Sequence, residues 1–91
     1  MSVYVDRAVH RYGRMIMCHM VADSPEELHA MAGHIGVDRR WFQEPSKALF
    51  WHYDVSKGKR LLAMSAGAIE LLDRVALVMV MHRIRASRAF L

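Results

Sequence analysis

The sequence predicts a small α/β or α+β protein, with a mixed, partly parallel sheet of about four short strands and three helices. Three observations favour this class. Short runs rich in β-branched and aromatic residues alternate with segments of helical spacing, a Ser-Pro-Glu-Glu sequence marks one helix start, and glycines stand where helices should end. The length of 91 residues fits a single domain over 1–91.

Strand composition recurs along the chain. Met15–Val21 is almost entirely apolar, which is typical of a strand buried on both faces. Arg7–Gly13 is polar and indicates a loop, and Pro45 blocks regular structure within Glu44–Trp51, which indicates another. The predicted strands are Ser2–Asp6, Met15–Val21, His52–Val55 and Ala68–Leu71, with Arg39–Gln43 as a further short candidate.

The strongest local signal is the start of the first helix. Ser24 and Glu27 form a capping box, in which each residue can satisfy a free backbone N–H of the other. Pro25 suits the first helical position, where its missing N–H has no cost. Apolar residues then recur with helical spacing up to Ile35, and Gly36 can adopt the left-handed conformation that ends a helix. The sequence therefore predicts a helix over Pro25–Ile35.

Two further helices are expected in the second half of the chain. Ser56 can cap a helix that runs to about Ala66, where Gly67 ends it. Asp73 can cap an apolar C-terminal helix over about 74–87, although a Val-rich strand over Ala76–Met81 is the competing interpretation. A helix that is apolar nearly all round is deeply buried or lies at an oligomer interface.

The composition points to anionic partners. Thirteen Lys and Arg against nine Asp and Glu give a net charge of +4, and ten of the cations are Arg, which suits bidentate contacts with phosphate or carboxylate. An anionic small molecule or a nucleic acid is the expected partner, and a basic surface that only aids solubility is the alternative. Eight Met residues and a hydrophobic fraction of 54% also favour a homodimer that buries extra apolar area.

The sequence also bounds the cellular setting. Cys18 is the single cysteine, so an internal disulfide and a cysteine-rich zinc site are excluded. Asp6 and Arg7 interrupt any N-terminal signal sequence, and the longest apolar run, Val75–Met81, is far shorter than the ~20 residues of a membrane span. We therefore expect a cytoplasmic protein with no membrane partner.

A basic turn is the first candidate binding site. If Ser56 caps a helix, Lys57, Lys59 and Arg60 fall in the first turn, where the helix dipole disfavours cations, and Gly58 is a poor helix former. Local stability thus argues against this composition, whereas free N–H groups, cations and a glycine suit an anion site. A solvated basic turn is the alternative, and the spacing is not that of a Walker motif.

Histidine and aspartate side chains on the predicted strands form the second candidate. His52 and Asp54 are two residues apart and point to the same face of a strand, which suits acid–base chemistry or metal binding. His19 lies inside an apolar strand, and Asp6, at the end of the first strand, can approach the same edge if the two strands are parallel neighbours. Cys18 cannot pair with His19, because adjacent strand residues face opposite sides.

No sequence motif identifies a metal site. HExxH and Cys/His patterns are absent, so a divalent metal is only a candidate cofactor, with His19, His52 and Asp54 as the ligands that could meet in space. His29 is a weaker ligand-binding candidate beside the apolar stripe of the first helix. Arg39 and Arg40 precede two aromatic residues, a pattern compatible with base stacking, although core packing of an aromatic is the alternative.

The chain resembles a family of small bacterial and phage proteins catalogued as domain of unknown function 4031. The resemblance covers about 2–72 and lies in Val5-Asp6, Cys18-His-Met-Val-Ala-Asp23, Glu27-Leu-His29, Ile35-Gly36, Arg39 to Phe42, His52-Tyr-Asp54 and Gly67-Ala68. It implies a role for the matching residues His19, Asp23, His29, His52, Tyr53 and Asp54, but it implies no activity. The chain departs from the pattern at Gln43, at Phe50-Trp51 and in its apolar last twenty or so residues.

Three functions follow as hypotheses. The first is capture of a phosphate-bearing ligand, a nucleotide or nucleic acid, at Ser56–Arg60 with help from Arg39 and Arg40. The second is a small hydrolase, with or without a metal, that uses His19, His52 and Asp54. The third is a protein-interaction module that uses the apolar C-terminal helix. The first ranks slightly above the second, because no catalytic motif is present.

Overall fold

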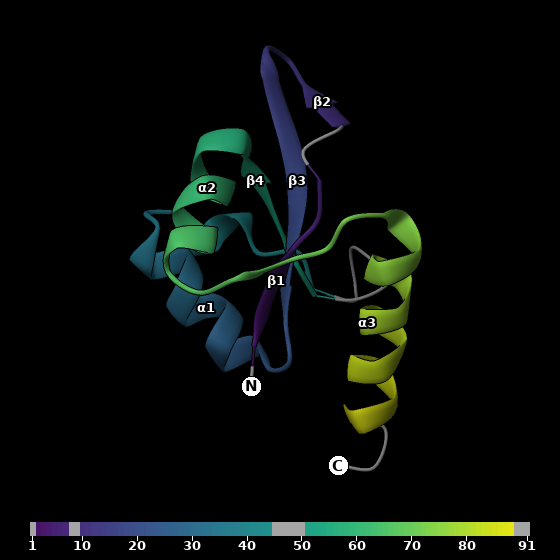
Figure 1. The fold of residues 1–91 in the computed structure, drawn as a ribbon. Coiled ribbons are helices and arrows are strands. Elements are labelled where there is room, and N and C mark those ends of the chain that lie inside the picture. Colours follow the sequence, from purple (N-terminus) through teal and green to yellow (C-terminus); the bar gives the residue numbers. More distant parts are fainter. Residues whose placement is uncertain (1, 8–9, 45–50, 89–91) are drawn as a thin grey trace.

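The computed structural model describes residues 2–7, 10–44 and 51–88, which form a mixed sheet with three α-helices, an α+β arrangement (Figure 1). This confirms the predicted class, and the described residues contain five strands where about four were expected. The strands are β1 (Val3–Val5), β2 (His10–Tyr12), β3 (Met15–Ala22), β4 (Tyr53–Ser56) and β5 (Ile69–Glu70). The helices are α1 (Pro25–His34), α2 (Lys57–Ser65) and α3 (Arg74–Arg88), with a short 3₁₀ helix, η1, over Arg39–Trp41.

The long strand β3 organises the sheet. It pairs antiparallel with β2 along its first half, with β1 along its second half, and with β4 on its other side. The pairing of β1 with β5 is parallel, and it is the only parallel pair among the described strands. The sheet is thus partly parallel, as predicted. Its register places His19 opposite Asp54 and Val5 opposite Met20.

The predicted loop over Arg7–Gly13 is wrong, because β2 occupies its second half. Tyr12 pairs with Met15 across a two-residue turn that begins at Gly13, whose φ is 60°. A glycine at the first central position is the requirement of a tight hairpin turn whose twist matches that of the strands. The sequence signal was therefore present in Gly13 itself, and reading the segment only by its polarity missed it.

Side chains alternate along the sheet between two layers of helices. The helices α1 and α2 cover one face and α3 lies on the other (Figure 1). Cys18 and Met20 belong to the core under α1 and α2, whereas Val21 packs with Leu71 and Leu77 on the α3 side. The first residues of β3 are exposed, so the prediction of a strand buried on both faces holds only for its second half.

The predicted N-cap and the glycine after α1 are confirmed, whereas the Glu27 carboxylate accepts from the Ser24 hydroxyl and not from the Ser24 backbone N–H. Ser24 Oγ accepts a hydrogen bond from the backbone N–H of Glu27 at 3.2 Å, and it donates to the Glu27 carboxylate at 3.0 Å. The helix ends at His34, one residue before the predicted end, and Gly36 has the left-handed φ of 78°. A cap that satisfies free N–H groups is worth about 1 kcal/mol, which explains why this boundary could be read from the sequence.

The caps of the other two helices also match. Ser56 accepts from the Lys59 N–H at 3.3 Å, and Gly67, with a φ of 105°, follows the end of α2. Asp73 Oδ1 accepts from the Ala76 N–H at 2.8 Å at the start of α3. The segment is therefore a helix, and the competing strand over Ala76–Met81 is wrong.

The short strand predicted over Arg39–Gln43 is wrong as well. Asp38 accepts from the Arg40 N–H at 2.9 Å, and this local side-chain bond favours the 3₁₀ turn of η1 over an extended segment. Within this segment, Gln43 forms an isolated β-bridge, through two backbone hydrogen bonds of 2.9 Å, with His52, the residue just before β4. The predicted loop over Glu44–Trp51 lies mostly at 45–50, outside the described residues.

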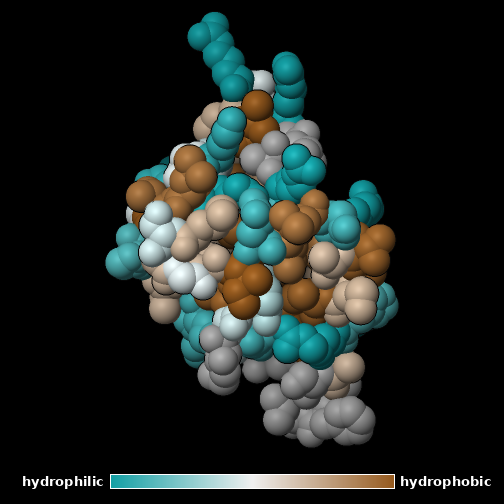
Figure 2. All heavy atoms as spheres, viewed as in Figure 1, coloured by the Kyte–Doolittle hydropathy of each residue, from teal (hydrophilic) through white to brown (hydrophobic). Residues whose placement is uncertain are grey.

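The C-terminal helix is not deeply buried. Leu77 and Ile84 are its buried described residues, whereas Val75 and Met79 are exposed. Apolar side chains gather over the side of the molecule where α3 lies (Figure 2). No helix within the described residues has the length and hydropathy to cross a membrane. A homodimer and a cytoplasmic location stay predictions.

The core under α1 should dominate stability. Leu28 is fully buried in that core, whereas Leu61 on α2 is 54% exposed. We expect Leu28→Ala to lower the free energy of unfolding by about 2–5 kcal/mol, because it removes buried methyl groups and leaves a cavity. Leu61→Ala should change it by less than about 0.5 kcal/mol. Urea denaturation followed by circular dichroism measures both, and equal losses would contradict the packing described here.

Candidate metal centre and adjoining cavity

Strand β3, strand β4 and the residue just before β4 bring three candidate residues together on the α3 side of the sheet. His19 of β3 stands opposite Asp54 of β4, and His52, two residues before Asp54, shares its face. One ligand atom of each residue lies within 4.8 Å of those of the other two. The His19 and His52 ring centroids are 5.4 Å apart and the rings meet edge to face. The predicted convergence of His19, His52 and Asp54 is therefore present in the structure.

Asp6 fixes the orientation of His19. One carboxylate oxygen, Oδ1, accepts from the His19 backbone N–H at 2.6 Å, and the other, Oδ2, lies 2.7 Å from Nδ1 of the ring. An ionised carboxylate can only accept, so the Nδ1 atom carries the proton and Nε2 is left toward Asp54. The sequence suggested that Asp6 could reach this edge through parallel strands, but β1 and β3 are antiparallel, and Asp6 meets His19 directly across that pair.

One oxygen of the Asp54 carboxylate accepts a hydrogen bond, and the other oxygen faces the two imidazoles. Gln43 Nε2 donates to Oδ2 at 2.7 Å. Oδ1 is buried and has no hydrogen-bond partner among the described residues. It lies 3.4 Å from His52 Nε2 and 4.0 Å from His19 Nε2, both beyond the ~3.2 Å of a well-formed N–H···O bond. This oxygen lies within ion-pair distance of both imidazoles but accepts no well-formed hydrogen bond, and a cation held between the three side chains would satisfy it.

The electrostatics of the cluster keep its carboxylate charged. The His52 side chain is the main cause that holds the pKa of Asp54 below 3.8, against the opposing effect of burial. The hydrogen bond that the His19 ring donates to Asp6 raises the pKa of His19 above 6.5, although burial acts the other way. Proton and metal therefore compete for the same His19 nitrogen.

This donor set matches a transition metal. Two imidazole nitrogens and one carboxylate oxygen suit Zn²⁺, Mn²⁺ or Fe²⁺ better than Mg²⁺ or Ca²⁺, which prefer oxygen alone. Tetrahedral binding with bonds of ~2.0–2.1 Å places neighbouring ligand atoms about 3.4 Å apart. The His52–Asp54 distance of 3.4 Å already has that value, the His19–Asp54 distance is 4.0 Å, and all three ligand atoms lie within 4.8 Å of one another.

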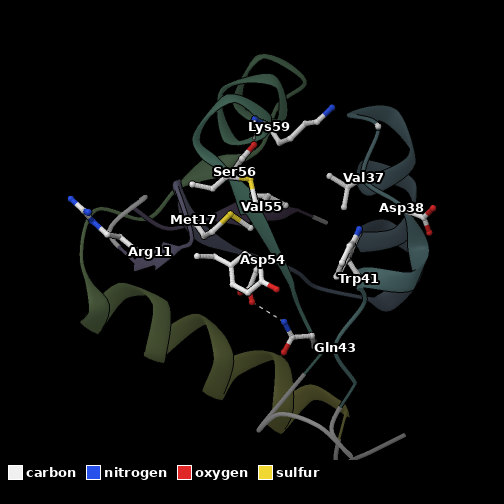
Figure 3. A pocket seen from close by; sticks show the side chains of 13 residues that line it. Arg11, Met17, Val37, Asp38, Trp41, Gln43, Asp54, Val55, Ser56 and Lys59 are labelled. Atoms are coloured by element: carbon white, nitrogen blue, oxygen red, sulfur yellow. Dashed lines mark hydrogen bonds between the residues drawn. The ribbon is translucent and has the colours of Figure 1, made fainter.

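A cavity of about 570 Å³ adjoins the cluster (Figure 3). Asp54 and Gln43 line it at one end and Ser56 and Lys59 at the other, so the carboxylate that faces the imidazoles also borders the cavity. Figure 3 shows α2 on the Lys59 side and Trp41, from η1, on the opposite wall from Met17. A volume of this size is typical of small-molecule sites, which measure ~300–1,000 Å³.

Only part of the predicted basic turn lines the cavity. Ser56 and Lys59 line the cavity, whereas Lys57 is exposed and is not among its lining residues. Arg60 turns to the fold instead: its Nε donates to the backbone oxygen of Asp6 at 2.7 Å, and its guanidinium pairs with Glu70. The composition of this turn is unusual, as the sequence indicated, but Arg60 binds Asp6, the residue that holds the His19 ring.

The remaining candidates lie elsewhere. His29 Nδ1 is 2.7 Å from the Tyr53 hydroxyl, on the face of β4 opposite to Asp54, and burial lowers its pKa. The Arg40 guanidinium lies 5.0 Å from the centre of the Trp41 ring. Arg39 and Arg40 are exposed, and neither is among the residues that line the cavity.

The sequence pointed to Trp41 through its basic–aromatic pattern, but it did not single out Gln43 or Arg11, two polar residues that complete the site. Gln43, Trp41 and Arg11 border the cavity, and Gln43 also holds Asp54. No local motif marks Gln43, because its backbone bridge to His52 spans a segment whose geometry only the folded chain sets. For Trp41, the basic–aromatic sequence 39–42 was the usable signal.

Cys18 is separate from this chemistry. It is fully buried among the core residues under α1 and α2, as the alternation of strand side chains predicted. Burial, with a smaller contribution from the charge of Asp6, raises the pKa of its thiol to about 12. The thiol is therefore neither a nucleophile nor a metal ligand at neutral pH.

The fold and this cluster define a small α+β protein with a candidate metal centre at the edge of its sheet. The chain belongs to the family described as "Protein of unknown function (DUF4031)", whose model matches residues 3–84. This confirms the resemblance seen in the sequence and extends it past the predicted limit of 72 into α3. No curated protein and no solved structure matches the chain significantly.

The Asp6–His19 contact gives a direct test by NMR. The His19 imidazole should titrate above pH 6.5 in the metal-free protein, and Asp6→Asn should lower that midpoint because it removes the charged acceptor. Since the folded pKa is raised, the contact stabilises the fold fully below about pH 6.5, and this contribution is lost as pH rises through the raised pKa. Glu26→Gln, which removes the same charge from the exposed surface of α1, is the control. An unchanged midpoint in Asp6→Asn would refute the role given to Asp6.

Proposed function

We propose that the protein is a metal-dependent hydrolase of phosphate esters, with a divalent transition metal held by His19, His52 and Asp54. The observation that carries the proposal is the buried Asp54 Oδ1, which lacks a hydrogen bond and faces two imidazole nitrogens at 3.4 and 4.0 Å. Protein interiors rarely leave a carboxylate oxygen in this state, and a cation between the three side chains would satisfy it.

The surroundings of these ligands support a metal further. Metal-binding histidines commonly donate their second ring N–H to a carboxylate, which fixes the tautomer, and Asp6 serves His19 in this way. Gln43 does the same for the carboxylate ligand, because it occupies Oδ2 and leaves Oδ1 for the ion. Each of these two ligands is therefore held by a second residue before the metal arrives, which is the arrangement of a preorganised site.

Three protein ligands are typical of a catalytic rather than a structural site. Structural zinc sites use four protein ligands, whereas catalytic sites use three and leave positions for water and substrate. His19 and Asp54 keep about one third of their side-chain surface exposed, so water and a ligand can reach the ion. The cavity beside Asp54 then provides the place for a substrate.

Cationic side chains that line the same cavity as Asp54 favour phosphate. Lys59 supplies a positive charge, and Arg11 adds a second. Ser56 lies at the N-terminus of α2, where the first N–H groups of a helix are free to bind an anion. These features, together with the net charge of +4, favour a phosphate ester over a neutral substrate.

The chemistry that follows is hydrolysis of a P–O bond. A divalent metal held by His19, His52 and Asp54 would lower the pKa of a water molecule and so supply the nucleophile. In the overall reaction one P–O bond to the water oxygen would form, the ester P–O bond would break, and the departing alkoxide would take a proton from water. Lys59 would offset part of the charge that develops on the phosphoryl oxygens. Capture of a phosphate-bearing ligand, the first hypothesis from the sequence, is the binding step of this reaction.

Metal binding is the first test. Calorimetry with Zn²⁺ and Mn²⁺ should show one ion per chain, and His19→Ala or His52→Ala should abolish it, because each removes a ligand. Asp6→Asn should weaken binding by about 10- to 100-fold, since it acts through His19. His34→Ala and His82→Ala, at exposed positions outside the cluster, are matched controls and should bind normally. Retained binding in both His19→Ala and His52→Ala would exclude this site.

Turnover is the second test and separates an enzyme from a binding protein. The metal-loaded protein should release p-nitrophenol from p-nitrophenyl phosphate or its bis ester, chelation should abolish the activity, and added metal should restore it. Asp54→Asn should reduce the rate by at least about 100-fold, because it removes the charged ligand. If the protein binds the metal tightly but hydrolyses neither ester, the hydrolase proposal fails and ligand capture is the function that stands.

A further inference from the structure

We propose that the substrate is a single nucleotide, a nucleoside monophosphate whose base stacks on Trp41 and whose phosphate lies near Lys59 and the metal. This inference rests on the proposed phosphate hydrolysis and adds the part of the substrate that the phosphate chemistry does not specify. The observation behind it is that aromatic, methionine and cationic side chains line one cavity. They are Trp41 and Tyr12, Met15 and Met17, and Lys59 and Arg11.

Trp41 can offer one face of its indole ring to a ligand in the cavity. Trp41 keeps 54% of its surface exposed, although it belongs to the cavity lining, and in Figure 3 its side chain stands along the wall. The Arg40 guanidinium, 5.0 Å from the ring centre, covers one face of the indole. The other face can accept a planar ligand, and base–aromatic stacking with a tryptophan is sequence-tolerant and strong. The sequence pattern 39–42, basic residues before aromatics, thus acquires a role.

Sulfur and apolar side chains complete this part of the cavity. Met15 and Met17 project from β3 and Val37 from the segment after α1. A thioether is polarisable and adapts to flat rings, so these residues suit a heterocycle better than a sugar. Tyr12, which is 67% exposed on the neighbouring strand, also lines the cavity and adds a second aromatic side chain.

The charges of the cavity match a phosphate only when the metal is present. Lys59 and Arg11 are balanced by Asp38 and Asp54, so the four charged lining residues sum to zero. A divalent ion makes the sum +2, which complements the −2 charge of a phosphate monoester. Lys59 makes no ion pair with the described residues, and its Nζ lies close to Gly36, 3.1 Å from where a Cβ on that glycine would stand. It is therefore available to an incoming anion.

The size of the cavity restricts the ligand to one nucleotide. About 570 Å³ falls within the range of small-molecule sites and is far too little for a duplex. We therefore commit to a mononucleotide, and binding of longer nucleic acid with no preference for a mononucleotide is a result that would overturn the proposal.

The experiment compares ligands that differ by one part. Adenosine 5′-monophosphate, ribose 5-phosphate and adenosine are titrated by calorimetry into the Zn²⁺-loaded and the metal-free protein. The complete nucleotide should bind at least about 10-fold more tightly than ribose 5-phosphate, because only the nucleotide stacks. A Trp51→Phe variant leaves Trp41 as the only tryptophan, so quenching of its fluorescence reports the base directly.

Matched variants test which residue binds the base and which binds the phosphate. Trp41→Ala should reduce nucleotide affinity to that of ribose 5-phosphate, whereas Trp41→Phe should keep the preference. Lys59→Gln should weaken the nucleotide and ribose 5-phosphate by the same factor, about 10-fold, and leave adenosine unchanged. Lys57→Gln removes an equal charge from the adjacent exposed position, outside the cavity, and should bind like the wild type.

The outcomes separate this inference from the proposed function. If the protein hydrolyses p-nitrophenyl phosphate but binds the nucleotide no better than ribose 5-phosphate, the nucleotide proposal fails and the hydrolase stands. If no metal binds but adenosine still quenches Trp41 and Trp41→Ala abolishes its binding, the base site stands and the hydrolase fails. Equal nucleotide affinity in the wild type and in Trp41→Ala overturns the inference in either case.

Discussion

The Asp6 carboxylate, which binds both the backbone N–H and the ring of His19, is the contact on which the site depends. It joins the end of β1 to the middle of β3 and sets the ring so that Nε2 points toward Asp54. Arg60 holds the backbone oxygen of the same Asp6 and pairs with Glu70 of β5. One aspartate thereby connects two strands, one helix and the candidate metal centre.

The alternation of side chains in strands explains why core and chemistry coexist in so short a chain. On β3, Cys18 and Met20 face the core under α1 and α2, while His19 between them faces the other side. On β4, Tyr53 and Val55 are buried in the core, while Asp54 faces His19; Val55 also borders the cavity beside Asp54 and Ser56. A one-residue shift of either strand would exchange these sets, so the apolar core also fixes the position of the polar residues.

How much the sequence foretold depends on whether an element is specified locally. The helices were predictable because their caps are short-range: Ser24, Ser56 and Asp73 each accept a hydrogen bond from the N–H three residues on. The hairpin at Gly13 also had a local signal, although polarity alone misled the prediction there. Residues 39–41 form a 3₁₀ turn because Asp38 supplies a cap that competes with extended structure.

The sequence by itself determined that helices accompany a mixed, partly parallel sheet, and it determined the N-caps of the helices, the shared face of His52 and Asp54, and the isolation of Cys18 from His19. These follow from periodicity and from bonds between residues close in the chain, and no long-range information is needed for them. Only the tertiary structure decided that His19 stands opposite Asp54, that Gln43 and Asp6 hold these two side chains, and that Arg60 serves the fold while Lys59 lines the cavity. Such contacts depend on strand register and on the placement of segments far apart in the chain, which packing of the whole core selects.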